Sequence, residues 1–217
     1  MLFLHRNGNN KMNTFSFLQI KTLFNDNNWD IGYLYPDEMK EVLNTPIKFP
    51  SNFPIYTEEL KFKLYLIVIK KTKNFDYTIR HDFYKTIKEN IPDLNLSYIY
   101  CNYKYAAVLA GLGQYARNTL LYHNKFQFET HFTMFGIEQE IVDLPVRNEP
   151  NFSLLKRCEN CYDCIKACPA QALHINSQGK TWIDTVACDD FNHYNNHPYI
   201  PSLKENWAKI EAPWLTE

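Results

Sequence analysis

The sequence predicts an α/β (α+β) fold with a mixed sheet over residues 14–150, followed by a small cysteine-rich module over residues 151–190. In the first part, apolar runs typical of strands alternate with amphipathic segments typical of helices. In the second part, four cysteines fall within eleven residues. A chain of 217 residues with 45% hydrophobic residues is long enough, and apolar enough, to bury the core that this arrangement needs.

The overall charge gives no reason to expect a strongly charged partner. The formal net charge is −1 and the sequence pI is about 6.7, so neither a nucleic acid nor an anionic membrane is indicated. The apolar run at the start is too short for a secretory signal, and no later run approaches the roughly 18 residues of a membrane span. We expect a cytoplasmic protein whose thiols stay reduced.

The first elements follow from apolar spacing and from helix-stop signals. Residues 1–13 are expected to be a disordered extension, and residues 14–25 have a loosely helical pattern that ends at an asparagine-rich cluster. Residues 29–35 are predicted to form a strand closed by a proline, and Asp37 is expected to cap a short helix over 38–43.

A proline-rich loop over residues 44–57 separates these elements from the most apolar strand of the chain, residues 62–69. A continuous apolar run is typical of a strand that is covered on both faces. Lysines flank the strand at positions 61, 63, 70, 71 and 73. They could bind phosphate, but charges that protect strand ends are the more ordinary explanation.

The middle of the chain continues the alternation of helices and strands. A helix is predicted over 82–91, capped near His81 or Asp82, and a strand over 95–101. A helix of small residues over 105–113 should end in a turn with positive φ at Gly111 or Gly113. A glycine pair that follows a helix does not satisfy the dinucleotide-binding fingerprint, in which the glycines open the helix.

The last part is predicted as strands, a linker and a tail. We expect strands over 119–123 and 128–142 and a linker over 145–150. The tail of residues 191–217 contains Trp207, Ile210, Trp214 and Leu215 after position 198, a content that favours a helix docked on the body.

The cysteine run carries the clearest chemical signal. Cys158, Cys161, Cys164 and Cys168, followed by Pro169, have the spacing C-x2-C-x2-C-x3-C-P of bacterial ferredoxins, which indicates a [4Fe–4S] cluster. A thiolate at every third residue lets a tight loop reach several corners of the cube. Structural zinc sites usually pair two knuckles a dozen or more residues apart, and neighbouring thiols in one loop cannot all form disulfides, so we prefer iron–sulfur to both alternatives.

The remaining thiol and histidine candidates have ordinary structural explanations. Cys101 is expected to be a strand or core thiol. Histidines 123, 131, 174, 193 and 197 are expected to be surface or packed residues. His193 and His197 are four residues apart but lack the glutamate of an H-E-x-x-H zinc motif, so we do not assign them to a metal.

Several segments resemble one family, the epoxyqueuosine reductases, which are relatives of the corrinoid-dependent reductive dehalogenases. Residues 110–121, AGLGQYARNTLL, resemble the family segment A-G-L-G-W-x-G-K-N-x-L-L, and a cysteine run follows at the expected place. Residues 29–32 and 82–88 resemble an early strand and a helix start of the family. The resemblance implies an iron–sulfur reductase with cobalamin as a second cofactor and transfer RNA as a partner.

The departures from the family pattern concern the parts that carry catalysis. The family has a longer segment before Ala110 with an acidic proton donor, whereas no Asp or Glu lies between Asp93 and Glu129 here; Tyr103, Lys104 or Tyr105 could donate a proton instead. The second cysteine run is also missing, and in relatives the fourth cysteine of a run serves the other cluster. Cys188 is therefore a rival to Cys168 as fourth ligand.

The function we expect is an iron–sulfur redox protein with one [4Fe–4S] cluster in a ferredoxin-like module. It would transfer electrons to or from a redox partner protein, without a membrane and without binding transfer RNA. The alternative is a corrinoid-dependent reductase acting on a small molecule or a modified transfer RNA.

Overall fold

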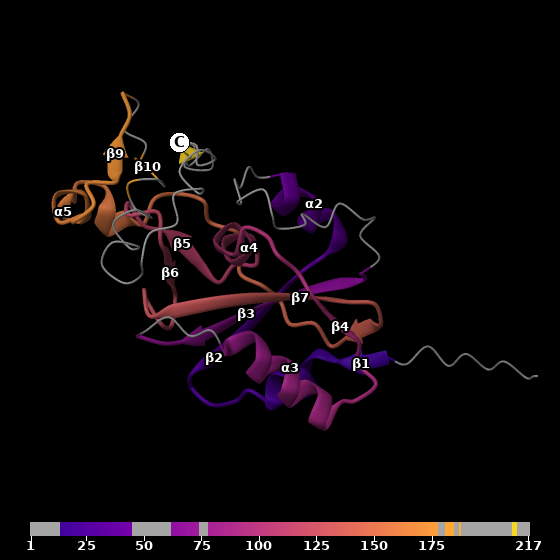
Figure 1. Cartoon of the computed structure of the whole chain (residues 1–217). Coiled ribbons are helices and arrows are strands. Elements are labelled where there is room, and N and C mark those ends of the chain that lie inside the picture. The colour runs from indigo at the N-terminus through magenta and orange to yellow at the C-terminus, as the bar shows by residue number, and fades with distance from the viewer. Residues whose placement is uncertain are drawn as a thin grey trace, which may run out of the picture.

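The computed structural model describes residues 14–44, 62–73, 78–177, 181–184, 187 and 210–211. Its centre is a four-stranded sheet in the order β2-β3-β7-β4, and every pairing in this sheet is antiparallel (Figure 1). Its strands are β2 (Trp29–Leu34), β3 (Leu64–Lys71), β4 (Leu96–Tyr98) and β7 (Thr130–Ile137). Two short strands, β1 (Thr14–Ser16) and β8 (Glu140–Val142), pair in parallel. The predicted α/β class is confirmed, but the described residues form no mixed sheet, because the parallel pair β1–β8 is separate from the antiparallel central sheet.

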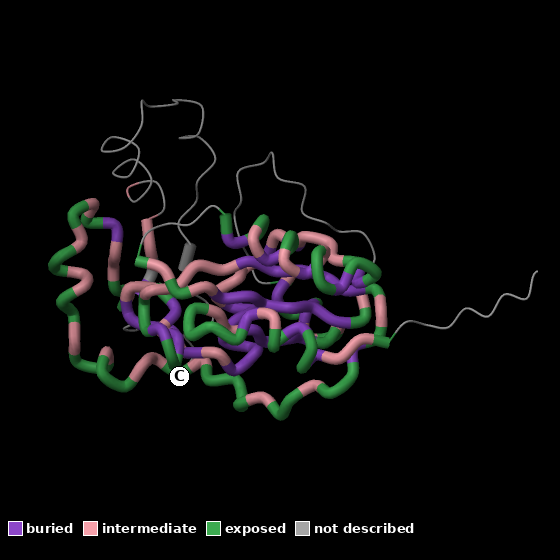
Figure 2. The backbone as a smooth tube through the Cα atoms, turned by 90° about the horizontal axis from the view of Figure 1, so that it is seen from below, coloured by how far each residue is buried: buried purple, intermediate pink, exposed green. Residues whose placement is uncertain are grey.

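Helices cover both faces of this sheet (Figure 1). They are α1 (Phe17–Thr22), α2 (Pro36–Asn44), α3 (Ile79–Asn90) and α4 (Tyr103–Leu109). Residues 64–69 of β3 are all buried, as predicted for a strand covered on both sides. Alternate side chains of β3 enter two separate apolar clusters, because successive strand residues point to opposite faces. Figure 2 shows the buried residues gathered along these strands.

The cluster under α1 and α3 is rich in aromatic rings. Phe83 of α3 stacks on Phe24 with ring centroids 4.5 Å apart and on Phe135 of β7 at 5.1 Å. The cluster under α2 and α4 combines Met39 and Val42 with the alanines and Val108 of α4. Small residues let α4 lie close to the sheet, as its sequence predicted.

Two helix starts differ from the predictions. The helix α2 begins at Pro36, two residues earlier than expected, and the cap comes from Glu38, whose carboxylate accepts the Tyr35 N–H at 2.7 Å. The expectation that Asp37 caps this helix is wrong, because the glutamate at the third helical position reaches back instead. The helix α3 begins at Ile79, before His81 and Asp82, and Thr78 Oγ1 donates to Asp82 Oδ2 at 2.7 Å.

The helix α4 ends in the turn predicted from its glycines. Gly111 has φ +73°, a conformation that favours glycine. Gly113 instead opens β5 (Gly113–Tyr115), which pairs with β6 (Leu121–His123) in an antiparallel hairpin. We call residues 113–123 the β5–β6 hairpin.

The segment predicted as a linker is bound to the body. Arg147 forms an ion pair with Glu38 at 2.6 Å and donates to the Tyr33 carbonyl at 2.8 Å. The Tyr33 hydroxyl donates to the Pro145 carbonyl at 2.7 Å. Residues 145–147 are thus tied to β2 and α2 and do not act as a free connection.

The last described elements contain or follow the cysteine run. They are the 3₁₀ helix η1 (Lys156–Cys158), α5 (Asp163–Lys166), β9 (Leu173–Ile175), β10 (Thr181–Ile183) and β11 (Ile210–Glu211). Residues 210–211 pair with β10 as a strand, so the helix expected there is wrong. Residues 1–13 and the tail positions 207, 214 and 215 lie outside the described residues. No helix among the described residues has the length and hydropathy to cross a membrane.

Candidate iron–sulfur site

The cysteine loop, residues 158–168, consists of two short turns. Cys158 is the last residue of η1, and its carbonyl accepts the Cys161 N–H at 3.3 Å. Cys164 lies in the single turn of α5, and Cys168 follows that turn. All four cysteines are free thiols of intermediate exposure. The cysteines of the run thus lie on two consecutive tight turns.

The third thiol of the run is affected by burial and by its neighbours. Burial raises the pKa of the Cys164 thiol, and the neighbouring thiols of Cys158 and Cys161 raise it further, because thiolates repel. Among the described residues, no three His, Cys, Asp or Glu side chains are gathered so as to hold a metal ion. A four-iron cube binds each thiolate through a different iron, so its ligands lie farther apart than those of a single ion. The four thiols have the chemistry, and in the sequence the spacing, of ligands for such a cube.

The fourth thiol of the run has its own contact. The Ala172 backbone N–H donates to Cys168 Sγ at 3.4 Å, and Ala172 is buried where the chain turns into β9. Backbone N–H groups directed at sulfur tune iron–sulfur clusters. Cys188 lies outside the described residues, so the choice between Cys168 and Cys188 stays a prediction.

The β5–β6 hairpin holds the cysteine loop on the body. The Tyr115 carbonyl accepts the Leu155 N–H at 2.9 Å, and Arg117, which follows Tyr115 in the chain, donates to the loop itself. The Arg157 guanidinium lies 4.2 Å from the ring centre of Tyr122. The AGLG segment thus leads into a platform for the cysteines, a relation that the linear sequence did not reveal.

The candidate proton donors are engaged in the interior. The Tyr103 hydroxyl lies 2.5 Å from that of Tyr98, and burial raises its pKa, with the Tyr98 hydroxyl adding to the rise. The Lys104 ammonium donates to the Thr119 carbonyl at 3.1 Å. The Tyr105 hydroxyl donates to Glu41 of α2.

Glu41 is a residue that sequence reasoning missed, because it lies 64 positions before Tyr105. Burial raises the pKa of Tyr105, and the Glu41 carboxylate raises it further. A carboxylate therefore lies beside the helix that follows the position of the missing family acid. The amphipathic pattern of α2 was the only signal in the sequence that could have placed Glu41 there.

The expected core thiol and packed histidine are found as predicted. Cys101 is buried and donates to Met134 Sδ at 3.2 Å. His123 is also buried, and its Nδ1 accepts the backbone N–H groups of Lys125 and Phe126 at 3.1 and 3.0 Å. Its Nε2 lies 3.2 Å from Asp30 Oδ2. Since Nδ1 accepts both bonds, the neutral ring carries its proton on Nε2. His193 and His197 lie outside the described residues.

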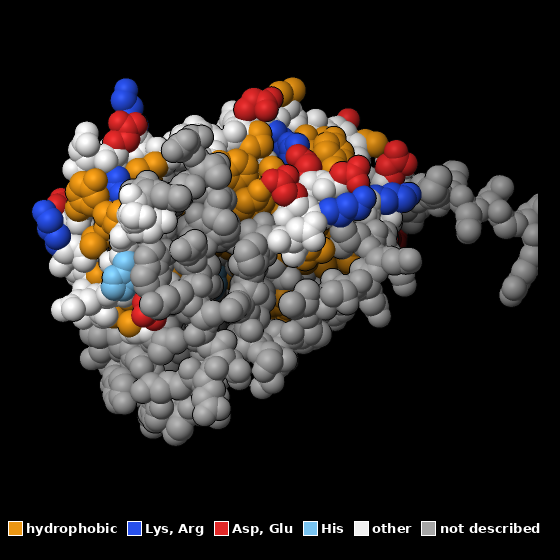
Figure 3. Space-filling view, turned by 90° about the horizontal axis from the view of Figure 1, so that it is seen from above, with side chains coloured by type: hydrophobic (Ala, Val, Ile, Leu, Met, Phe, Trp, Pro, Cys, Tyr) orange, Lys and Arg blue, Asp and Glu red, His pale blue; other side chains and the backbone are white. Residues whose placement is uncertain are grey.

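Two of the flanking lysines have acidic neighbours. Lys70 pairs with Asp82 at 3.2 Å and lies over the Trp29 ring, and Lys71 is 3.8 Å from Glu129. Figure 3 shows basic and acidic side chains next to one another on the face seen from above. These contacts agree with lysines that protect strand ends.

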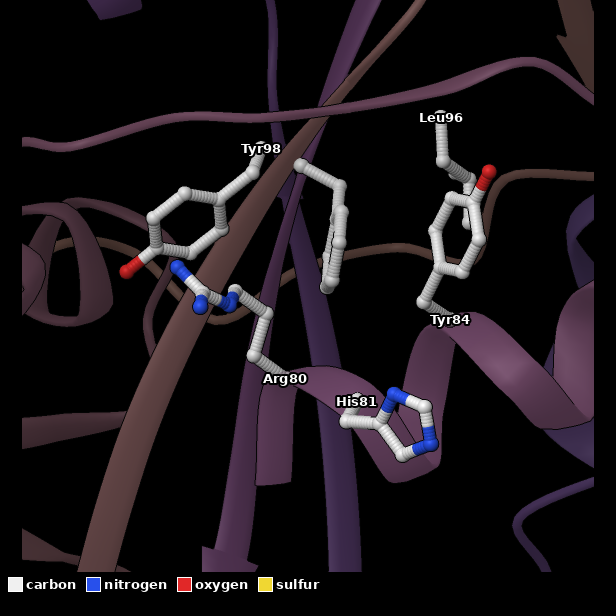
Figure 4. Close-up of a pocket in the computed structure, with 6 residues that line it drawn as sticks. Arg80, His81, Tyr84, Leu96 and Tyr98 are labelled. Carbon is white, nitrogen blue, oxygen red and sulfur yellow. The ribbon is translucent and has the colours of Figure 1, made fainter. Parts of the chain in front are cut away.

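A small open cavity of about 250 Å³ lies between α3 and β4 (Figure 4). It is lined by Arg80, His81, Tyr84, Leu96, Tyr98 and Phe135. The Arg80 guanidinium stacks 4.4 Å from the Tyr98 ring centre and donates to the Tyr100 hydroxyl at 3.1 Å. Pockets for drug-sized ligands start near 300 Å³, so this cavity does not fit a corrinoid.

Several solved structures similar to this chain are epoxyqueuosine reductases. An epoxyqueuosine reductase from Streptococcus thermophilus matches with a TM-score of 0.47 and 13% identity, over 71% of this chain and 52% of the reductase. An epoxyqueuosine reductase with an epoxyqueuosine-modified tRNA-Tyr stem loop matches with the same TM-score and identity. One from Bacillus subtilis matches with a TM-score of 0.44 and 15% identity, over 72% of this chain and 53% of the reductase.

All three are epoxyqueuosine reductases. This is the family that the sequence resembles. The chain aligns with about half the length of each, between 51% and 53%. No protein-family model and no curated protein matches the chain. With TM-scores below 0.5, the likeness carries no argument about fold or activity, and both rest on the residues of this chain.

Proposed function

We propose that this chain is an iron–sulfur redox protein that holds one [4Fe–4S] cluster. Cys158, Cys161 and Cys164 provide three ligands, and Cys168 or Cys188 provides the fourth. The observation that carries the proposal is the cysteine loop, in which four free thiols at ferredoxin spacing lie on two consecutive tight turns. When bound, such a cluster supplies a centre that takes up and releases one electron at a time.

The chain's own residues set where electrons enter and leave. Residues 151–171 are exposed or of intermediate exposure, so the loop lies at the surface, within reach of a second protein (Figure 2). Tyr162, between the second and third cysteines, is 40% exposed and presents a ring at that surface. We therefore propose a redox partner protein that docks over the cysteine loop.

Anaerobic purification of single variants tests the ligand set. Cys164→Ser should remove most of the bound iron and the broad visible absorption of the cluster. The variants Cys168→Ser and Cys188→Ser separate the two rivals, because only loss of the true fourth ligand should lower iron content. If neither change lowers it, the four-thiolate site is wrong. Cys101→Ala is the matched control, since a buried thiol outside the loop should leave the absorption per folded chain unchanged.

Elemental analysis of the same samples separates iron–sulfur from zinc. The proposal requires about four irons and four sulfides per chain after anaerobic reconstitution. One zinc per chain, without sulfide and without visible absorption, would replace the cluster by a structural zinc site. Because both ions bind thiolates, the ratio of sulfide to metal decides between them.

The second candidate is a reductase that acts on a small molecule or a modified transfer RNA. The observation in its favour is the Glu41–Tyr105 pair, which places a carboxylate and a phenol together near the segment where relatives have an acid. Reconstitution with iron, sulfide and cobalamin, followed by gel filtration, tests it. Stoichiometric retention of cobalamin, with its cobalt reduced through the cluster, would favour the reductase; no retention favours the electron carrier.

Transfer RNA should not bind tightly. Affinity for nucleic acid comes largely from neutralising phosphates, and this chain has a net charge of −1 with interspersed charges on the face in Figure 3. We expect no salt-sensitive complex with a transfer-RNA stem loop at physiological ionic strength in a filter-binding or polarisation assay. A sub-micromolar complex that weakens steeply with added salt would contradict this and support the reductase.

A further inference from the structure

One buried arginine of the body reaches the first turn of the cysteine loop. The side chain of Arg117 is 4% exposed, and its Nε and Nη2 donate to the carbonyls of Cys158 and Glu159 at 2.9 and 2.8 Å. The last carbonyls of a helix have no partner within the helix, and η1 ends at Cys158. A planar guanidinium with parallel donors can bind two successive carbonyls at once. Arg117 therefore fixes the backbone direction with which the first ligand leaves η1.

The same guanidinium also contacts the residue that follows Cys161, the second proposed ligand. Its central carbon lies 4.4 Å from the ring centre of Tyr162, the residue directly after Cys161. One side chain thus contacts positions 158, 159 and 162, on both sides of Cys161. The placement of two proposed ligands depends on this residue.

Arg117 can position the loop because hydrogen bonds fix the turn in which its own backbone lies. It lies in the turn of the β5–β6 hairpin, where Ala116 and Leu120 share a backbone hydrogen bond of 2.9 Å. Lys104 of α4 donates to the Thr119 carbonyl of this turn at 3.1 Å. Tyr115, two residues before Arg117, binds Leu155 ahead of η1. The hairpin therefore contacts the loop at two points.

The charge of Arg117 also matters for a redox centre. A guanidinium keeps its charge at every pH the protein meets, and among the described residues its contacts are carbonyls and a ring, with no carboxylate at ion-pair distance. A nearby positive charge in a partly buried site is weakly screened. When the site takes up one electron from a donor it becomes more negative by one charge, and a fixed cation stabilises that form.

We propose that Arg117 is a positioning residue for the cluster loop and that its charge raises the reduction potential of the site. This inference rests on the proposed function. It concerns a residue outside the cysteine motif, in the turn of the hairpin. Two separate properties should depend on Arg117: how firmly the ligands are held depends on its geometry, and the potential depends on its charge.

Two substitutions separate geometry from charge. Arg117→Lys keeps the charge but cannot bind two carbonyls and stack on Tyr162 together, and Arg117→Gln loses both. Reconstituted protein would be titrated electrochemically, and iron release to a chelator would be followed under anaerobic conditions. We expect several-fold faster iron release from both variants, a clearly lower midpoint potential for Arg117→Gln, and a potential close to wild type for Arg117→Lys.

Arg157→Gln is the matched control. Arg157 precedes Cys158 in the chain, but it is exposed, so removing its charge should move the potential less than Arg117→Gln does. Equal shifts in the two variants would overturn the special role of Arg117, and so would unchanged potential and iron release in Arg117→Gln. A wild-type chain that binds no iron would overturn the proposed function itself. Circular dichroism of the variants checks that the body is folded.

Discussion

The sheet of the body and the cysteine loop are stabilised by different kinds of contact. Six successive residues of β3 are buried, and two apolar clusters pack against them. Residues 151–171 contain no buried residue, and the contacts described above hold them through carbonyls, guanidinium groups and rings. The body therefore carries the stability of the fold, whereas the loop keeps its thiols near the surface. A redox site needs access, and access limits how much apolar surface its own residues can bury.

The largest loss of stability is expected when an aromatic ring is removed from the core of the body. Phe135 is 1% exposed and stacks on Phe83, so Phe135→Ala should lower the free energy of unfolding by about 3–5 kcal/mol, measured by urea denaturation. Leu18→Ala, at a position 64% exposed, should change it by about 0.5 kcal/mol or less. Because the loop depends on the body, cluster absorption should be lost together with the body's circular dichroism. Absorption that survives body unfolding would show an independent module.

Where the body meets the chain that leads to the cysteine loop, one glycine should not tolerate a side chain. An alanine at Gly111 would adopt φ +73° and place its Cβ 2.3 Å from the Asn148 carbonyl oxygen. The backbone conformation alone costs about 1–2 kcal/mol, and the contact forces the chain entering the cysteine module to move. Gly32→Ala is the comparison, since its closest neighbour is the end of the Leu112 side chain at 2.9 Å. We expect Gly111→Ala to lower thermal stability more than Gly32→Ala; the reverse order would contradict the turn.

The contacts that bind residues 145–147 to β2 and α2, which we call the tether, should contribute less to stability than the core. Their effect should also be local. Arg147→Ala removes the 2.6 Å ion pair with Glu38 and the bond to the Tyr33 carbonyl, and should cost about 1–3 kcal/mol. Hydrogen exchange should show faster exchange over residues 145–150 with little change in β3. Lys40→Ala is the control, because its ion pair with Asp37 is exposed and solvent screens it. Uniform loss of protection across the sheet would show that the tether belongs to the core.

The smallest expected effect is a pH dependence at Asp30. Burial raises the pKa of this carboxyl, but the facing His123 ring and Lys21 lower it by more, so the net pKa lies below its ordinary value of 3.8. A lowered folded pKa stabilises the fold above about pH 4, and this contribution disappears as the pH falls through the folded pKa. Asp30→Asn should cost about 1 kcal/mol or less at pH 7 and progressively less toward pH 3, in urea titrations. The exposed Asp93→Asn should show no such trend.

Local patterns predicted the elements that depend on local chemistry. The continuous apolar run predicted β3, and the glycines predicted the turn at Gly111, because burial on both faces and positive φ leave direct signs in sequence. The cap of α2 was assigned to Asp37 instead of Glu38, since both lie in the first turn and only the backbone geometry distinguishes them. The strand at 210–211 depends on a partner, β10, that apolar content cannot identify.

The sequence predicted the cysteines of the candidate site but not the contacts that Arg117 and Glu41 make. Cysteine spacing is a chemical requirement and is visible in the sequence. Arg117 and Glu41 act on residues 41 and 64 positions away, and their roles follow from packing between elements. A single sequence carries no pattern for such contacts, because Arg and Glu are common surface residues and their partners are set by packing between elements.

The tether of residues 145–147 also bears on the order of folding. Its bonds join residues 109 to 114 positions apart, so the chain must close a very long loop before they form. Loop closure on this scale costs entropy that only an assembled sheet can offset. During synthesis, the cysteines emerge from the ribosome after every strand of the central sheet. The residues of β2, β3 and β7 therefore leave the ribosome before the cysteine loop is complete, so the sheet that holds residues 145–147 can form before the loop does.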